Sequence, residues 1–180
     1  MQLNNWKMLC GTAIDDISIT LINHIQALIE KYDKKNIKLI TACDSQRRGS
    51  KITYVTVIIV LNTGFGGNAF YLKEIEDCSE FLYKNTNSRA ERLLKVKALI
   101  QKRLWNETLK AVECAMAVDE LVYNLGLKVS EVHADINTNK KFKSSELSKA
   151  IIGYIDACGF IPKVKPDAWG ASGIANIKTK

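Results

Sequence analysis

Residues 39–46 read LITACDSQ, an apolar and β-branched run that ends on an acid at Asp44. Side chains alternate along a strand, so this run predicts a strand that carries Asp44 on the same face as Ile40 and Ala42. An acid at the end of an apolar strand is costly to bury unless something uses its charge. Asp44 is therefore a candidate metal ligand, and the alternative is a turn residue that begins the polar segment 44–50.

Two later segments repeat this pattern, EVHADIN around Asp135 and KVKPDAW around Asp167. If the strand of Asp135 lies beside the first strand, the two aspartates can share a site for hard cations such as Mg²⁺. The alternative for Asp135 is again a turn residue that ends a strand. His133 lies on the same strand face and could assist proton transfer, although a single strand histidine is more often structural.

The rest of the chain shows the periodicities of alternating helices and strands. A polar turn over 47–50 and a glycine-rich turn over 64–67 separate the first three strands. In chain order, the predicted elements are a helix over 12–32, strands over 35–46, 51–61 and 68–75, a helix over 88–125, a strand over 128–136, a helix over 144–158, a strand over 160–165 and a helix over 168–177.

This order predicts an α/β (α+β) fold, in which three antiparallel strands and then alternating helices and strands build a mixed five-stranded sheet flanked by helices. No repeat or linker interrupts the chain, so we expect 1–180 to form one domain. Within it, 1–36 is a helical N-terminal extension and 37–180 is the core. The pattern over 88–125 fits one helix or two, because Asn106 could mark a kink.

The composition is that of a soluble globular domain, with 47% hydrophobic and 25% charged residues. The formal net charge of +7 favours a polyanionic partner through long-range attraction. Five cysteines without a CxxC pair do not fit a disulfide framework or a zinc site, and they fit a reducing cytoplasm. No signal-peptide pattern and no apolar run approaching ~18 residues occurs, so we expect a cytoplasmic protein outside the membrane.

The long predicted helix supplies a third acidic candidate, Glu107. It is one turn from Ala111 and next to Thr108, within the apolar stripe of the helix, whereas Glu113 is roughly 200° around the helix from Ala111. An acid within a buried stripe needs a partner, so Glu107 is the better candidate. The alternative for Glu107 is a salt bridge with Arg103 or Lys110. The stripe consists of Leu104, Thr108, Ala111, Ala115, Val118, Val122 and Leu125.

Asp167 follows Pro166 and precedes the last predicted helix, a position typical of an N-cap. A cap and a metal ligand are compatible roles, because the carboxylate has a second oxygen. Basic residues flank the first two acids, and such residues would hold the phosphates of a nucleic acid without reading its sequence. They are Arg47, Arg48 and Lys51 after Asp44, and Lys140, Lys141 and Lys143 after Asp135.

Five segments together resemble the YkuK family, a branch of the ribonuclease H-like superfamily, over residues 37–180. They are TACDSQ (41–46), RLWNETLKAVECA (103–115), HADINTN (133–139), SSELSKAIIGYIDACGF (144–160) and KPDAWGASGIAN (165–176). The resemblance implies a catalytic and metal-binding set at Asp44, Glu107, Asp135 and Asp167. Asn176 departs from the pattern, because an acid is expected there. If that position holds the fourth ligand, Asp167 is only a cap.

The acids and the resemblance together favour a nuclease that hydrolyses phosphodiester bonds of RNA, DNA or a hybrid with two Mg²⁺ or Mn²⁺ ions. The alternative is a non-catalytic module that binds nucleic acid on the same fold. A third class, an ATP-handling or protein-interaction domain, is disfavoured because the glycine-rich segment 64–67 is followed by a strand and not by a helix.

Overall fold

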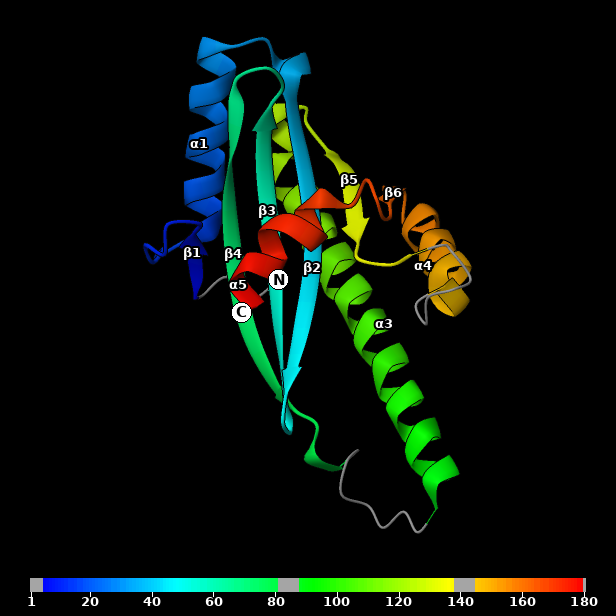
Figure 1. Cartoon of the computed structure of the whole chain (residues 1–180). Coiled ribbons are helices and arrows are strands. Elements are labelled where there is room, and N and C mark those ends of the chain that lie inside the picture. Colours follow the sequence, from blue (N-terminus) through cyan, green and yellow to red (C-terminus); the bar gives the residue numbers. More distant parts are fainter. Residues whose placement is uncertain (1–4, 81–87, 138–144, 180) are drawn as a thin grey trace.

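The computed structural model describes residues 5–80, 88–137 and 145–179. In these residues one sheet of six strands runs through the molecule, in the order β1-β4-β3-β2-β5-β6 (Figure 1). The strands are β1 (Trp6–Met8), β2 (Ile37–Arg48), β3 (Lys51–Asn62), β4 (Gly66–Asp77), β5 (Val129–Ala134) and β6 (Ile161–Lys163). The helices are α1 (Ile17–Lys31), α3 (Arg89–Val122), α4 (Ser145–Ala157), the π-helix η3 (Gly170–Ala175) and α5 (Asn176–Thr179).

The strand pairing confirms the predicted fold class. β2, β3 and β4 form an antiparallel meander, and β5 pairs in parallel with β2 and with β6. The sheet has one more strand than predicted, because β1 pairs antiparallel with β4 at the edge. A three-residue strand is too short to show an alternating pattern, so periodicity could not reveal it.

The first helix is shorter than the predicted 12–32, because Asp16 is its N-cap. The Asp16 carboxylate accepts hydrogen bonds from the backbone N–H groups of Ser18, at 2.7 Å, and Ile19, at 3.1 Å. The residues before the cap are held instead by a bridge between Lys7 and Ala13. The predicted helix therefore began too early, because the apolar periodicity includes residues 12–16, which precede the first residue of α1.

α3 is one helix of 34 residues, which decides between the one-helix and two-helix alternatives. Asn106 does not interrupt it, and its side-chain amide donates a hydrogen bond to the Tyr54 hydroxyl at 3.3 Å. Gly126, with a φ of 60°, closes the short 3₁₀ turn that follows α3 in the left-handed conformation that glycine tolerates. Of the helices in the described part of the chain, none has the length and apolar character needed to cross a membrane.

Two further boundaries differ from the prediction. β2 continues to Arg48, so the turn predicted over 47–50 is reduced to two residues, and Gly49 adopts the positive φ of 61° that this tight turn requires. The final helix was predicted over 168–177. It begins as the π-helix η3 and ends as α5, which extends to Thr179.

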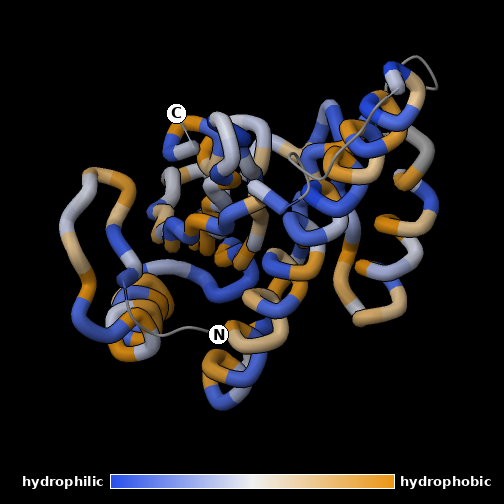
Figure 2. Tube along the Cα trace, turned by 90° about the horizontal axis from the view of Figure 1, so that it is seen from below, coloured by the Kyte–Doolittle hydropathy of each residue, from blue (hydrophilic) through white to orange (hydrophobic). Residues whose placement is uncertain are grey.

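The alternation of β2 divides the core between the two faces of the sheet. Leu39 and Cys43 pack on the face covered by α1, α3 and α4, whereas Ile40 and Ala42 pack on the face covered by η3. Figure 2 shows hydrophobic and hydrophilic stretches alternating along the helices, as expected for helices that cover a sheet on one side. By the same alternation, Asp44 lies on the η3 face and the next residue lies on the α3 face.

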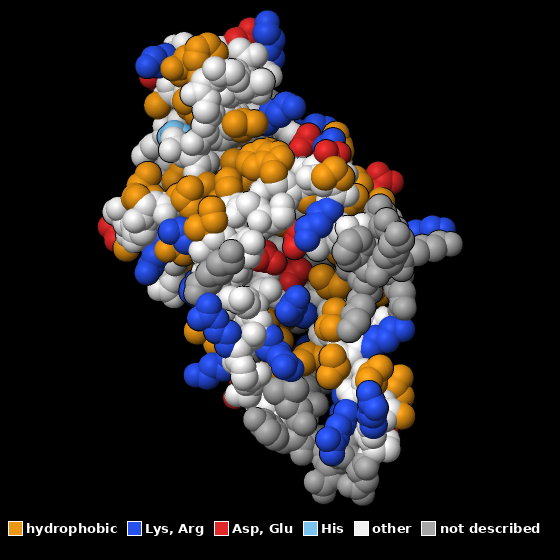
Figure 3. Space-filling model, in the orientation of Figure 1, with side chains coloured by type: hydrophobic (Ala, Val, Ile, Leu, Met, Phe, Trp, Pro, Cys, Tyr) orange, Lys and Arg blue, Asp and Glu red, His pale blue; other side chains and the backbone are white. Residues whose placement is uncertain are grey.

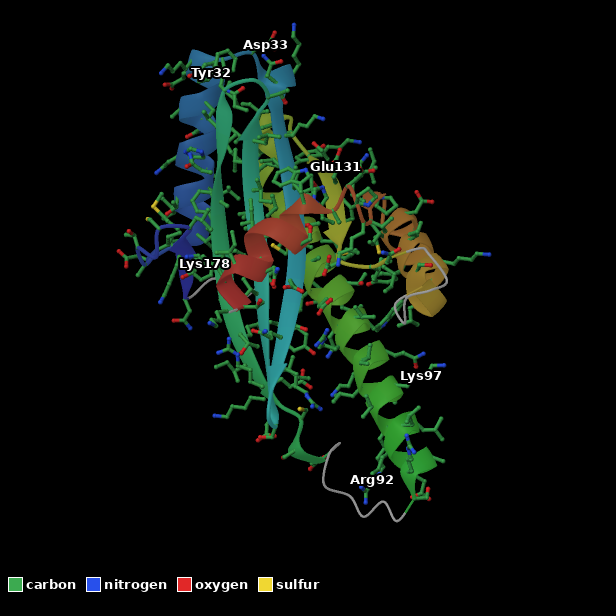
Figure 4. The ribbon with its side chains drawn as sticks, viewed as in Figure 1. Tyr32, Asp33, Arg92, Lys97, Glu131 and Lys178 are labelled. Carbon is green, nitrogen blue, oxygen red and sulfur yellow. The ribbon has the colours of Figure 1, made fainter. Side chains whose placement is uncertain are left out.

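His133 attaches the C-terminal helix to the sheet. Its side chain is fully buried, and Nδ1 accepts a hydrogen bond from the Gly170 backbone N–H at 3.0 Å. Nε2 lies 3.0 Å from the Glu131 carboxylate, so it carries the proton and donates (Glu131 is labelled in Figure 4). Burial lowers the pKa of His133, which favours the neutral ring that this arrangement needs. This arrangement favours the structural alternative for His133 over a role in proton transfer.

Gly170 lets this helix approach the sheet closely. A Cβ atom there would lie 2.9 Å from His133 Nδ1 and 3.0 Å from Ile59 Cδ1. We expect Gly170→Ala to lower the free energy of unfolding by about 1–3 kcal/mol, measured by urea denaturation. Gly173→Ala is the matched control, because nothing lies within 4 Å of its added Cβ. Equal stability of the two variants would contradict close packing at Gly170.

Candidate active site

Two of the predicted acids meet because of the register between β2 and β5. The parallel pairing of these strands ends at Cys43 opposite Ala134. Asp44 is the next residue of one strand and Asp135 is the next residue of the other. Parallel strands end at the same edge of a sheet, so the register places the two aspartates together where the strands separate. In open α/β sheets, ligands bind in the crevice outside these carboxyl ends.

Glu107 approaches the end of β2 from α3, where it contacts Ser45, the residue next to Asp44. This helix packs along β2, where the Thr41 hydroxyl donates a hydrogen bond to the Ala111 carbonyl oxygen at 2.9 Å. One turn earlier on α3, Glu107 accepts a hydrogen bond of 2.5 Å from the Ser45 hydroxyl. Its side chain is buried, with 4% exposure, as its place in the apolar stripe predicted. Glu113 is exposed, also as expected from its position on the helix.

Burial and neighbouring charges raise the pKa of two of the three acids, Asp44 and Glu107. Burial, and after it the nearby Asp135 carboxylate, raise the pKa of Asp44 to about 6. Burial is also the largest cause at Glu107, where the pKa is raised to about 8 although the Ser45 hydrogen bond and Arg103 oppose the shift. The carboxylates of Asp44 and Asp135 add to the rise at Glu107. Like charges of this kind disfavour the ionised state unless a cation joins them.

Two cations already neutralise part of this charge. Arg103 Nε lies 3.6 Å from Glu107 Oε1, and Lys165 Nζ lies 3.0 Å from Asp135 Oδ1. Neither contact is a hydrogen bond of good geometry. Arg103 Nε and Asp135 Oδ1 are both buried, and both lack a hydrogen-bond partner. Figure 3 shows the acidic side chains gathered in a hollow in the middle of one face, with Lys and Arg side chains around it. The Arg103 alternative for Glu107 is therefore present, while Lys110 pairs with Glu74 at 2.9 Å.

The donor set suits a hard divalent cation in its chemistry. Its members are carboxylates from three separate elements, and a buried oxygen of Asp135 lacks a hydrogen bond. Within the described residues, however, no group of three His, Cys, Asp or Glu side chains is arranged to hold a metal ion. The present arrangement instead satisfies the acids with Arg103, Lys165 and Ser45. The residues fit the ion by type and charge, and binding it requires the side chains to close together.

Asp167 does not join the other three acids. It is exposed, and its charge acts on His133. It does not cap the last helix at Gly170, because that N–H donates to His133. The residue of the C-terminal helix that reaches Asp44 is Thr179, whose hydroxyl lies 3.4 Å from Asp44 Oδ2 and bonds more closely, at 2.9 Å, to the Asn176 carbonyl oxygen.

Sequence reasoning missed three residues that shape the site: Ser45, Lys165 and Thr179. Each acts through a contact between elements distant in sequence, so no local spacing indicated it. The role of Ser45 as the donor to Glu107 depends on how α3 packs on β2 and could not be seen from the strand alone.

The predicted basic rim is placed only in part. Arg47, Arg48 and Lys51 are exposed at the hairpin end of β2 and β3. Lys140, Lys141 and Lys143 lie outside the described residues. α3 adds basic residues that were not predicted, including Arg92 and Lys97, both exposed on its first half (Figure 4). In Figure 3, Lys and Arg side chains gather below the acidic hollow, over the hairpin and over this part of α3.

The raised pKa of Glu107 makes a prediction for pH dependence. The folded state binds the Glu107 proton more tightly than the unfolded state, in which the carboxyl has its ordinary pKa of 4.5. This contribution to stability is therefore complete below about pH 4.5 and is lost as the pH rises through about 8. We expect Glu107→Gln to be more stable than the wild type at pH 8.5, by roughly 1–3 kcal/mol, and to lose that advantage at pH 4.5.

Urea denaturation of the metal-free protein at both pH values measures this difference. Glu113→Gln is the control on the exposed side of the same helix. A stability difference for Glu107→Gln that is the same at both pH values would contradict the raised pKa.

One comparison with known proteins found a match, to a family model. The model of the family described as ribonuclease H-like matches residues 20–180. No curated protein and no solved structure matches the chain. The matched range contains β2, α3 and β5, which supply the three acids, and also the C-terminal helix. The chain therefore belongs to the ribonuclease H-like family, in its YkuK branch, and has a fold associated with nucleic acids.

Proposed function

We propose that this protein is a divalent-metal-dependent nuclease that hydrolyses phosphodiester bonds in RNA, DNA or a hybrid. One observation carries the proposal. The pKa values of Asp44 and Glu107 are raised at the point where β2 and β5 separate, by burial and in part by the neighbouring charge of Asp135. A protein that needed only a stable core would not gain from this arrangement, because it leaves like charges in a hollow.

Asp44, Glu107 and Asp135 are the residues that would hold two Mg²⁺ or Mn²⁺ ions. Such ions activate water and stabilise the leaving oxygen of a phosphodiester. Asp44 is central to the set, because its charge acts on Glu107 and it responds to Asp135. Ser45 orients the Glu107 carboxylate. Arg103 is a positioning residue, which balances the charge of the acids from within α3. Asp167 stays outside this set.

The basic surface supports a nucleic acid as the substrate. Arg47 and Lys51 on the hairpin and Arg92 on α3 are exposed, and Figure 3 shows Lys and Arg side chains around the acidic hollow. Phosphate contacts from such residues position a strand without selecting a sequence. The formal net charge of +7 adds long-range attraction to a polyanion.

A non-catalytic nucleic-acid-binding module is the second candidate, and a specific observation favours it. Lys165 and Arg103 already pair with two of the acids, and neutral residues, Asn176 and Thr179, stand in the C-terminal helix near Asp44. A site with three acids and two cations carries less net negative charge than a dedicated two-metal site needs.

A cleavage assay separates the two candidates. The purified chain is incubated with Mn²⁺ and labelled single-stranded RNA, duplex DNA, an RNA–DNA hybrid and a four-way junction. We expect cleavage of at least one substrate, and we expect Asp44→Asn or a chelator to reduce the rate by at least about 100-fold, because the central ligand is lost.

Glu113→Gln serves as the matched control for an acid on α3 that faces away from the hollow, and it should cleave at the wild-type rate. Absence of cleavage on every substrate, with nucleic-acid binding intact, would leave the binding module. Cleavage that persists in Asp44→Asn would point to a contaminating nuclease or to another site.

The basic hairpin makes a separate prediction about binding. The double variant Arg47→Ala/Lys51→Ala should bind RNA or DNA less tightly on every sequence, and the slope of log affinity against log salt should fall by roughly 1–2. Fluorescence anisotropy at several salt concentrations measures this slope. Lys149→Ala, an exposed lysine on α4, is the control and should leave the slope unchanged. An unchanged slope in the double variant would remove the hairpin from the binding surface.

A further inference from the structure

The position of Lys165 in the acidic site is set by the backbone. The Lys165 N–H donates a hydrogen bond of 3.1 Å to the carbonyl oxygen of Ile136, the residue that follows Asp135. The chain segment after β6 is therefore fastened beside the segment after β5. This bond brings the lysine stem next to Asp135 whether or not the side chains interact.

Lys165 and Asp135 form a close ion pair without a hydrogen bond. Lys165 Nζ lies 3.0 Å from Asp135 Oδ1, yet this oxygen is buried without a hydrogen bond of good geometry. The lysine side chain is 41% exposed, whereas that of Asp135 is 19% exposed. The ammonium can therefore move into water at small cost while the carboxylate stays in the site.

Arg103, the other cation of the site, differs in this respect. It pairs with Glu107 within one turn of the same helix, and its side chain is 29% exposed. Its side chain is less exposed than the Lys165 side chain, so moving its planar guanidinium into water requires a larger rearrangement. A lysine ammonium is a compact point charge on a flexible stem, with no fixed direction for its contacts. Of these two side chains, Lys165 is the one that a metal ion can displace from its carboxylate.

We propose that Lys165 is a built-in counter-ion of the acidic site, which holds Asp135 while the site contains no divalent cation and is displaced when one binds. The role rests on the proposed function, because it requires Asp135 to be a metal ligand. In the metal-free protein it limits the repulsion between Asp135 and Asp44. It also sets a threshold for metal binding, since the ion must compete with a charge supplied by the chain.

Metal affinity tests this role without reference to cleavage. Isothermal titration of the full chain with Mn²⁺ compares the wild type with Lys165→Met, which keeps the stem and removes the charge. We expect Lys165→Met to bind Mn²⁺ about two- to fivefold more tightly. Lys165→Arg retains the charge and should bind no more tightly than the wild type.

Lys128→Met is the matched control for the loss of one positive charge. Lys128 is exposed and precedes β5, so it lies about 20 Å along that strand from Asp135, beyond the range of unscreened interaction at 0.1 M salt. Its affinity for Mn²⁺ should equal that of the wild type.

Amine labelling gives an independent readout of displacement. A lysine-reactive acylating reagent, followed by mass spectrometry, should label Lys165 faster after Mg²⁺ is added, while labelling of Lys128 stays constant. If the wild type binds Mn²⁺ but Lys165→Met shows neither tighter binding nor a difference from Lys128→Met, the counter-ion role is overturned and the metal site stands. If neither the wild type nor Lys165→Met binds Mn²⁺, both the counter-ion role and the proposed metal-dependent function are overturned.

Discussion

The parallel pairing of β2 with β5 is the constraint on which the rest of this site depends. Its last pair, Cys43 with Ala134, fixes where the two strands separate, and the two aspartates follow directly on each strand. A shift of the register by one residue would turn one aspartate to the opposite face of the sheet. The two faces of β2 pack in different core clusters, Leu39 and Cys43 in one and Ile40 and Ala42 in the other, and this division opposes such a shift.

Burying these acids destabilises the fold, and the neighbouring groups offset part of that cost. Buried carboxylates near one another would destabilise the fold if all were ionised and alone. The chain offsets this cost with a hydroxyl from Ser45, a guanidinium from Arg103 and an ammonium from Lys165. Each of these groups comes from a different element. Ser45 and Arg103 both lower the pKa of Glu107 and so oppose the effect of its burial.

The sequence predicted the fold class and the three acids of the hollow because those features have local signals. Strand alternation placed Asp44, the apolar stripe of α3 placed Glu107, and the repeated strand-end pattern placed Asp135. It could not separate Asp167 from this set, because a proline and a following helix look the same whether the acid faces the site or the solvent. Lys165, Ser45 and Thr179 act across the fold, and their partners are set by packing that no spacing along the chain reveals.

The length and continuity of α3 have a mechanical consequence. Glu107 lies past the middle of this helix, and Arg92 lies fifteen positions earlier, about 22 Å away along a straight axis. The helix has no break between them and so behaves as a rigid rod over this distance. A displacement of the outer half of α3 would therefore move the Glu107 carboxylate with it, because no hinge lies between the two positions. Contacts made at the exposed start of the helix and the position of the acid in the hollow are mechanically linked.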